Sequence, residues 1–259
     1  METSAIVTDL MKFLDASSVN FLAVREICRR LGEAGFTRLD PADHWTLTPG
    51  EKYYITQNDS AVIAFIPAQS GPAAPFRIIS AHSDSPGFRI KPHAEMKGEG
   101  GIVRLNTEVY GGPILYTWFD RPLSIAGRVI LRSDSVFNPV RRTVRIDRPI
   151  LTIPHLAIHF NRAVNEGNPL SRQKDMLPVL GYVNDSLRHD NILLNLMASE
   201  LNVDIDDILD FDLSLFDTTP ACTLGLNGEF LSSGRIDDLS MVHAAVTSLI
   251  DRADDNPGA

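Results

Sequence analysis

An apolar run that ends in a histidine and an aspartate constrains this chain more than any other feature. Residues 76–80 are rich in isoleucine, His82 and Asp84 follow them, and Pro86 keeps the next residues from forming a helix. Apolar runs bounded by turn-forming residues are typical of buried strands, and ligands gather at the carboxyl ends of strands in open α/β sheets. We therefore predict a buried strand that ends in half of a metal site.

The pair His82 and Asp84 suits a metal ligand and its supporting carboxylate. One ring nitrogen of His82 can bind a metal while Asp84 hydrogen-bonds the other, which fixes the tautomer and raises the basicity of the ligand. Taken alone the pattern is weak, because a histidine at a strand end and an aspartate capping a Ser-Pro turn give the same letters. The assignment therefore depends on further ligands elsewhere in the chain.

A second candidate ligand lies far along the chain, in the pair Asp237 and Asp238. The pair follows a Ser-Ser-Gly loop and precedes a helical pattern of apolar residues over 239–250. Acidic residues at a helix entrance also serve as N-caps or interact favourably with the helix dipole. We expect that one of the two acids can cap while the other coordinates, and that Asp237 and His82 converge on one divalent-ion site.

The first ninety or so residues predict the opening of an α/β domain. Apolar residues recur at helical spacing over 6–14 and again over 24–35. Segments at 53–56 and 62–66 predict two strands, and the polar residues 57–60 predict the hairpin turn between them.

From about residue 92 the pattern changes to short strands separated by glycine and proline. Polar and apolar residues alternate over 103–109, 124–131 and 143–147, which predicts antiparallel strands with one face in water. A helix over about 190–201 and a strand over about 209–215 complete this part of the chain.

These changes divide the chain into three segments, and the fold class is α/β with a β-rich insertion. Residues 1–91 form the first part of an α/β domain, 92–224 the inserted domain, and 225–259 the return to the first domain. The helix predicted after Asp238 is not followed by the return strand that a βαβ unit requires, so the α/β domain is expected to be incomplete.

Composition indicates a soluble globular protein and excludes two classes of partner. No apolar run in the 259 residues approaches the roughly 20 needed to span a bilayer, and a net charge of −9 argues against a nucleic-acid surface. The N-terminus lacks the basic region of a secretion signal. Cys28 and Cys222 lie in apolar sequence, so we expect reduced core thiols in a cytoplasmic protein.

Five segments, in the same order, resemble the M18 family of metallo-aminopeptidases, the aspartyl aminopeptidase group. They are Ala-His-Ser-Asp-Ser-Pro at 81–86, Val-Tyr-Gly-Gly at 109–112, Trp-Phe-Asp-Arg-Pro-Leu-Ser-Ile-Ala-Gly-Arg-Val at 118–129, Ile-Pro-His-Leu-Ala-Ile-His at 153–159 and Arg-Ile-Asp at 235–237. The similarity extends over nearly all of the chain, and five motifs in one order are far more specific than any one of them. One departure concerns the site, since Asp238 stands where the family usually has asparagine.

The resemblance implies a zinc-peptidase-like α/β domain with an inserted oligomerisation domain, and hydrolysis of the first peptide bond of a peptide substrate. It implies two divalent ions, zinc in this family, with His82 as a ligand of one ion and Asp237 as a bridge between both. Asp84 then supports His82 as a catalytic residue. Some members favour acidic N-terminal residues. The resemblance also implies a homo-oligomer, in which a histidine assigned here to His159 reaches the active site of a neighbouring subunit and helps hold the substrate or its transition state.

Two further pairs of residues remain open to more than one interpretation. His155 and His159 share a face in either a helix or a strand, so they could bind zinc together, but packing explains them equally well. Trp118 and Phe119 could anchor either the core or a subunit interface.

The resemblance also implies residues that this sequence does not contain. The family's general-base Glu-Glu pair, a further metal-binding aspartate and a last histidine lie beyond the position of Asp237. Because a zinc site needs three or four protein ligands, we expect the chain alone to have little or no peptidase activity. Three explanations stay open: a truncated product, a second polypeptide that supplies the rest, or a catalytically inactive assembly or regulatory subunit.

Overall fold

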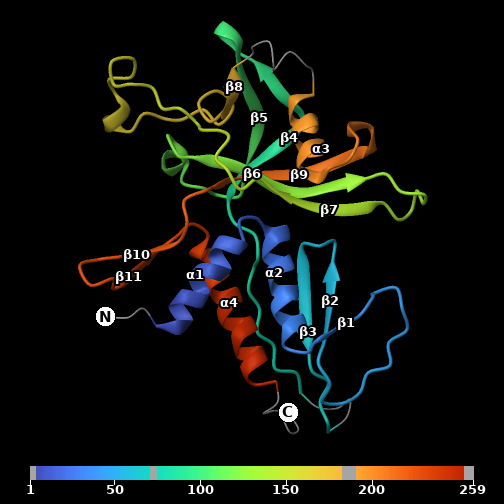
Figure 1. Ribbon diagram of the computed structural model, residues 1–259. Helices are drawn as coiled ribbons and strands as arrows, with labels where there is room; N and C mark the ends of the chain where they lie inside the picture. Colours follow the sequence, from blue (N-terminus) through green and yellow to red (C-terminus); the bar gives the residue numbers. More distant parts are fainter. Residues whose placement is uncertain (1–3, 71–74, 183–190, 254–259) are drawn as a thin grey trace. The chain divides into compact units, whose positions relative to one another are not determined.

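The computed structural model describes residues 4–70, 75–182 and 191–253, and the chain divides into two compact units (Figure 1). One unit consists of Met1–Ser85 and Pro220–Ala259, and the other is Pro86–Thr219. The sequence pattern predicts the boundaries between the two units after residues 91 and 224, a few residues later than they lie in the structure.

The first unit combines a small mixed sheet with three helices and a hairpin, as far as the described residues go. Its helices are α1 (Ala5–Ala16), α2 (Asn20–Glu33) and α4 (Ile236–Asp251). Its strands are β1 (Thr37–Arg38), β2 (Tyr53–Gln57) and β3 (Ala61–Phe65), in the order β1-β2-β3, with β10 (Cys222–Leu224) and β11 (Phe230–Ser232) forming a separate hairpin. β1 pairs with β2 in parallel, and β3 pairs antiparallel with β2. Asn58 and Asp59 join β2 and β3 with positive φ angles of 51° and 56°, as a tight hairpin turn requires.

Each helix of this unit buries one apolar face in a shared core, which is why the helical spacing of apolar residues predicted them. The core receives Leu14 from α1, Leu31 from α2, Tyr54 from β2 and Leu239 from α4. Full burial of such a side chain stabilises a fold by roughly 1.5–3 kcal/mol, so packing of this face holds the helices together.

A polar contact at the edge of this core ties α1 to both other helices. Asp9 of α1 accepts a 2.6 Å hydrogen bond from Nη1 of Arg30 in α2, and its Oδ2 lies 2.7 Å from Nε2 of His243 in α4. His243 is only 4% exposed. The hydrogen bond from Arg30 lowers the pKa of Asp9 to about 2, against the opposing effect of partial burial, and the contact with His243 adds to the lowering. The charged form of Asp9 is therefore the one that the fold stabilises.

The second unit is built on a six-stranded sheet of antiparallel pairs, within the described residues, in the order β7-β6-β9-β4-β5-β8. Its strands are β4 (Gly87–Lys97), β5 (Ile102–Tyr110), β6 (Leu123–Leu131), β7 (Val140–Arg145), β8 (Val179–Tyr182) and β9 (Ile208–Asp217). Helix α3 (Ile192–Leu201) and the short 3₁₀ helices η1 (Glu99–Gly101), η2 (Leu115–Trp118), η3 (Val164–Glu166) and η4 (Ile205–Asp207) complete it. The alternating segments thus form antiparallel strands, as predicted.

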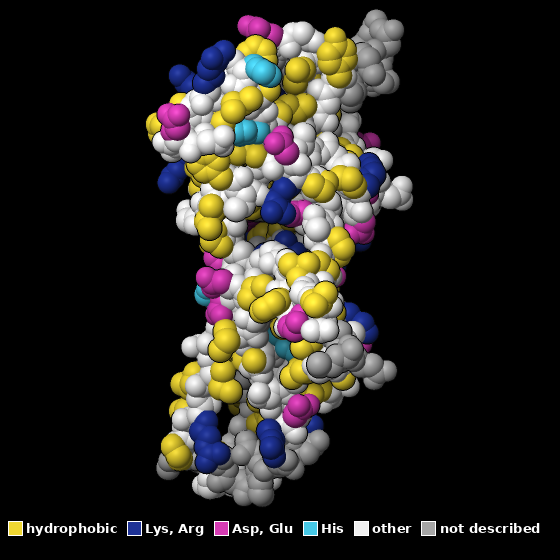
Figure 2. All heavy atoms as spheres, turned by 90° about the vertical axis from the view of Figure 1, so that its left-hand side faces the viewer, with side chains coloured by type: hydrophobic (Ala, Val, Ile, Leu, Met, Phe, Trp, Pro, Cys, Tyr) yellow, Lys and Arg dark blue, Asp and Glu magenta, His cyan; other side chains and the backbone are white. Residues whose placement is uncertain are grey.

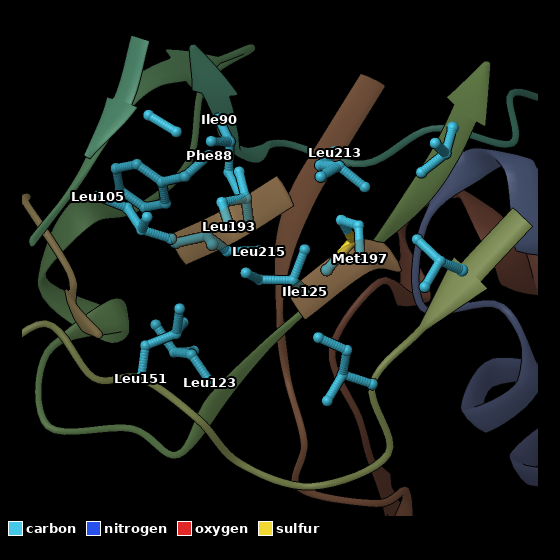
Figure 3. Close-up of a cluster of buried hydrophobic side chains, with 14 of the residues drawn as sticks. Phe88, Ile90, Leu105, Leu123, Ile125, Leu151, Leu193, Met197, Leu213 and Leu215 are labelled. Atoms are coloured by element: carbon cyan, nitrogen blue, oxygen red, sulfur yellow. The ribbon is translucent and has the colours of Figure 1, made fainter. Parts of the chain in front are cut away.

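Helix α3 closes one side of this sheet. Its Leu193 and Met197 lie among side chains from the strands, including Phe88 of β4, Ile125 of β6 and Leu213 of β9 (Figure 3). All five side chains are buried. The second unit therefore has a hydrophobic core of its own.

Trp118 and Phe119 pack against this core. The Trp118 ring meets Phe88 edge-on at a centroid distance of 5.0 Å, and the Phe119 ring lies 4.5 Å from that of His155. Both side chains are half-buried within the unit. These contacts support a role in the core, and a role at a subunit interface stays a prediction.

The predicted strand at 76–80 is not formed. Residues 75–85 adopt no regular secondary structure, and the side chains of Phe76, Ile78 and Ile79 are 90%, 82% and 69% exposed. A strand requires neighbours that satisfy its backbone groups, and no described strand pairs with this segment. The apolar run that predicts burial therefore lies in solvent.

The prediction of two core cysteines is also wrong in part. Cys28 is half-buried and Cys222 is exposed on β10, although both are free thiols. Partial burial raises the pKa of the Cys28 thiol. Cys222 is exposed because the hairpin of β10 and β11 forms a separate two-stranded sheet.

Every helix in the described ranges is too short or too polar to cross a membrane.

The contact of Asp9 with Arg30 and His243 gives a pH-dependent prediction. Asp9→Asn should lower the free energy of unfolding by about 1–2 kcal/mol near pH 6. This is the usual value of a charge-assisted hydrogen bond, reduced because Asp9 is partly exposed to solvent. Because the pKa of Asp9 is lowered from 3.8 to about 2, this stabilisation is complete above pH 3.8 and disappears as the pH falls through about 2. Urea unfolding of both proteins at several pH values measures the difference. Asp43→Asn, at an exposed position, is the matched control, and an equal loss there would contradict the assignment.

Gly127 in β6 gives a second prediction. A Cβ atom at this position would lie 2.1 Å from the carbonyl oxygen of Asp212 in the paired strand β9. Gly127→Ala should therefore lower the free energy of unfolding of the second unit by about 1–3 kcal/mol. Gly32→Ala in α2, where an added Cβ meets nothing within 4 Å, should instead stabilise by about 0.5–1 kcal/mol. Thermal unfolding of the two variants would show opposite shifts, and shifts of the same sign would refute the close approach of β6 and β9.

Candidate metal centre

His82 and Asp237, from opposite ends of the first unit's sequence, meet in space. Nε2 of His82 lies 3.2 Å from Oδ1 of Asp237, so the convergence predicted from the sequence is present. The His82 side chain is 54% exposed and that of Asp237 is 92% exposed. Both groups are therefore open to a ligand from solvent.

Asp84 holds the other nitrogen of the imidazole ring. Nδ1 of His82 lies 3.0 Å from the main-chain carbonyl oxygen of Asp84 and 3.3 Å from its carboxylate Oδ1. A carbonyl oxygen can only accept, so Nδ1 carries the hydrogen, and in the neutral ring Nε2 is the nitrogen left for a metal. This is the tautomer that a metal ligand needs.

Asp238 positions the main chain of His82. Its Oδ2 accepts a 3.1 Å hydrogen bond from the N–H of His82 and lies 3.9 Å from Nε2 of the same residue. Arg235, with a positive φ of 64°, precedes α4, but Asp237 and Asp238 have non-helical backbone angles, so the regular part of the helix begins after the two aspartates. The peptide bond between Asp237 and Asp238 is cis.

Sequence reasoning missed this role of Asp238 and a smaller role of Ser85. The Ser85 hydroxyl donates a 3.4 Å hydrogen bond to the carbonyl oxygen of Asp237, beside the contact that Asp238 makes with His82. Together these bonds join the loop that carries His82 to the start of α4. The sequence feature that could have indicated this role is the second acid, Asp238, beside Asp237. Only helix capping or metal coordination was predicted for this pair.

Negative charge dominates the electrostatics around the imidazole. Partial removal from water opposes protonation, but the hydrogen bond to the Asp84 carbonyl and the charges of Asp238, Asp84 and Asp237 raise the pKa of His82. The same carboxylates that favour a proton on the ring also favour a divalent cation beside it.

The distance between the two candidate ligands fits zinc. Bonds of about 2.0–2.1 Å in a tetrahedral site separate two ligand atoms by about 3.3–3.4 Å, close to the 3.2 Å between His82 and Asp237. Over 4–70, 75–182 and 191–253, no group of three or more His, Cys, Asp or Glu residues is arranged to hold a metal. Since zinc takes three or four protein ligands, the described residues do not form a zinc site by themselves.

The histidines of the 153–159 motif lie in the second unit and have different environments. The main-chain N–H of His155 donates a 3.0 Å hydrogen bond to Oδ1 of Asp120, and its ring packs on Phe119. His159 is exposed in a turn, so the pair lies in neither the helix nor the strand that its spacing allowed. Contact of His159 with a neighbouring subunit stays a prediction.

Comparison with known families decides the affiliation of the chain. The family described as "Aminopeptidase I zinc metalloprotease (M18)" matches residues 13–258. The chain belongs to the M18 aminopeptidase family. The resemblance seen in the five sequence motifs is thereby confirmed.

Individual relatives agree with this affiliation. The chain is 47% identical over 242 residues to "Probable M18 family aminopeptidase 2" of Clostridium novyi. The aligned region covers 93% of this chain and 56% of that protein. Its counterpart in Clostridium acetobutylicum is 48% identical, with the same coverage. The chain thus spans little more than half the length of the curated M18 relatives it matches.

Solved structures confirm the α/β fold class. The structure titled "Cryo-EM structure of the Ape4 and Nbr1 complex" superimposes with a TM-score of 0.91 at 33% identity, over 97% of this chain and 51% of that one. The Chaetomium thermophilum mApe1 structure gives a TM-score of 0.85 at 32% identity, over 95% and 58%.

The hydrogen bond between Asp238 and His82 predicts a local change in hydrogen exchange. Asp238→Ala removes the acceptor of the His82 N–H, so exchange of this amide should become at least tenfold faster. Asp238→Asn keeps an acceptor oxygen and should leave the exchange within about threefold of the original rate. Site-resolved exchange measured by NMR tests both variants, and equal rates in the two would show that the bond does not hold the loop.

Proposed function

We propose that this chain provides part of the active site of a metal-dependent aminopeptidase, which removes N-terminal residues from peptides by means of a metal-activated water. The observation that supports this most directly is the 3.2 Å approach of Nε2 of His82 to Oδ1 of Asp237 in an M18 chain. Because the chain spans only part of its relatives, we propose the activity for the full-length enzyme of the family.

In this proposal each described residue has one task. His82 would hold a zinc ion through Nε2, since Asp84 holds Nδ1 on the other side of the ring. Asp237, whose carboxylate is exposed, would hold the metal together with His82. Zinc, when bound, lowers the pKa of a coordinated water and polarises the carbonyl group of the substrate. Asp238 keeps the loop of His82 against helix α4.

We extend the proposal to substrates with an acidic N-terminal residue, on the resemblance to the aspartyl aminopeptidase group. The general base and the remaining metal ligands are proposed to come from the part of the family's sequence that this chain does not span.

Homo-oligomer formation through the second unit is part of the same proposal. His159 is flanked by Ile158 and Phe160, which are both exposed large hydrophobic residues. Apolar side chains around an exposed histidine suit a surface that packs on a neighbouring subunit. The proposed compartment is the cytoplasm, which the free thiols of Cys28 and Cys222 support.

A second candidate function is that of a catalytically inactive assembly or regulatory subunit. It is favoured by the lack of a complete ligand set among the described residues and by the solvent exposure of Asp237. Zinc binding separates the two candidates, since only the enzyme part requires a metal at His82.

Titration of the purified chain with zinc tests the proposed ligands. His82→Ala and Asp237→Asn should each weaken zinc binding about 10–100-fold, because each removes one of few ligands. Asp84→Asn should cost about tenfold, at the low end for a supporting group, because its main-chain carbonyl still holds Nδ1. Asp134→Asn, at an exposed position in the second unit, is the control. Calorimetry that detects no zinc binding by the original chain would favour the inactive subunit.

A further inference from the structure

We infer that the outer edge of strand β7 is a docking site for an extended peptide that carries two neighbouring acidic residues. β7 (Val140–Arg145) is the last strand on one side of the six-stranded sheet, and among the described strands it pairs only with β6. None of the residues proposed for the metal centre lies in this surface, so its test is independent of the proposed function.

The outer side of β7 offers main-chain groups to a further strand. Apart from the pairing with β6, no main-chain hydrogen bond joins residues 140–145 to another described residue. In an antiparallel pair, alternate residues direct their N–H and C=O groups away from the partner strand, and a peptide can bind these groups by β-augmentation. Strand residues rise by about 3.3 Å each, so the edge accommodates a peptide of about six residues.

Two arginines determine what kind of peptide fits. Arg141 and Arg142 are both exposed, and neither forms an ion pair with a described residue, whereas the nearby Arg145 pairs with Asp147 at 2.8 Å. Neighbouring residues of a strand point to opposite faces, so a strand docked beside β7 meets one guanidinium group on each face. Two neighbouring acids in the peptide would each form a cross-strand ion pair with one arginine.

Positive charge is concentrated near this edge, although the chain as a whole is acidic. Residues 128–148 contain six arginines and two aspartates, while the net charge of the chain is −9. β8, at the other edge of the sheet, carries no charged side chain. By comparison, the Lys and Arg side chains on the face in Figure 2 stand in small separate groups. An acidic peptide is therefore attracted to the β7 edge over the β8 edge.

Apolar side chains beside the arginines add to this surface. Val136 and Phe137, in the turn between β6 and β7, are each 93% exposed, and Val140 is 39% exposed. The turn extends away from the sheet (Figure 1). Charged residues on an edge strand commonly prevent pairing with other sheets, but that role would not place large apolar side chains next to them. The combination suits a peptide with apolar residues beside its acids.

A second copy of this chain and a nucleic acid fit the edge less well. Three of the six residues of β7 are arginines, and like charges opposite each other destabilise a strand pair, so two copies of β7 repel each other. Binding of nucleic acid by charge depends on neutralising several phosphates, and the net charge of −9 opposes it.

Binding of labelled hexapeptides to this chain tests the docking site. The probe is Thr-Val-Glu-Glu-Val-Thr, whose palindromic sequence can place its two acids opposite Arg141 and Arg142 in either strand direction. The reference peptide has Gln-Gln in place of Glu-Glu. Fluorescence anisotropy at low ionic strength should give the probe a Kd at least about fivefold lower than that of the reference peptide. Slower hydrogen exchange at alternate amides of residues 140–145 should locate the bound probe on β7.

Two matched double variants separate this edge from general attraction by charge. Arg141→Gln combined with Arg142→Gln should bring the ratio of the two Kd values to about one. Arg162→Gln combined with Arg172→Gln removes the same charge at exposed positions elsewhere in the second unit, and should leave the ratio unchanged. Because all four side chains are exposed, neither variant should alter the unfolding of the chain, which urea unfolding checks.

A methylated peptide tests the main-chain pairing. The two valines of the probe are three residues apart, so one of their N–H groups faces β7 in either register, and methylation of both amides should weaken binding at least about fivefold. Equal Kd values for the acidic and reference peptides, equal losses in the two double variants, or full binding of the methylated probe overturns the docking site. Self-association that protects β7 without peptide, or tighter binding of a short DNA duplex through the same arginines, overturns it as well.

Discussion

The position of helix α4 against α1 and α2 is the constraint on which the candidate metal centre depends. Leu239 and Val242 bury one face of α4 in the core of the first unit, and His243 on the same helix meets Asp9 of α1. The acids at the start of α4 are therefore held at a fixed place in this unit. No described strand pairs with the loop that carries His82, and its bonds to Asp238 and Asp237 join it to the start of α4.

The two units differ in how completely they pair their backbone groups and bury their apolar side chains. In the second unit, antiparallel strands exchange backbone hydrogen bonds and α3 covers their apolar face, so its core is closed within Pro86–Thr219. In the first unit the helices are well packed, but the segment at 76–80 leaves both its backbone and its side chains in water. The core of the second unit thus buries its apolar segments, whereas the core of the first unit leaves the apolar residues 76–80 exposed.

The sequence predicted the features that depend on local pattern. Helical spacing around Leu14 and Leu31, the hairpin at Asn58 and the alternating strands of the second unit all follow from short-range periodicity and turn chemistry. The meeting of His82 with Asp237 was predicted because both stand at the end of a patterned segment in a recognisable family order. The irregular, exposed conformation of residues 76–80 could not be predicted in this way. An apolar run favours a strand, but a strand forms only where other strands pair with it, and pairing is not visible in the local sequence. The role of Asp238 was missed for a related reason: its bond to the His82 main chain is long-range and has no periodic signal.

The main-chain carbonyl of Asp84 determines what a substitution at this position would change. It lies nearer to Nδ1 of His82 than the carboxylate of the same residue does, so the ring would keep its tautomer even if another side chain replaced the acid. The orientation of the imidazole therefore depends mainly on the course of the loop. A substitution at position 84 would change chiefly the charge beside the ring, and with it the strength with which the histidine could hold an ion.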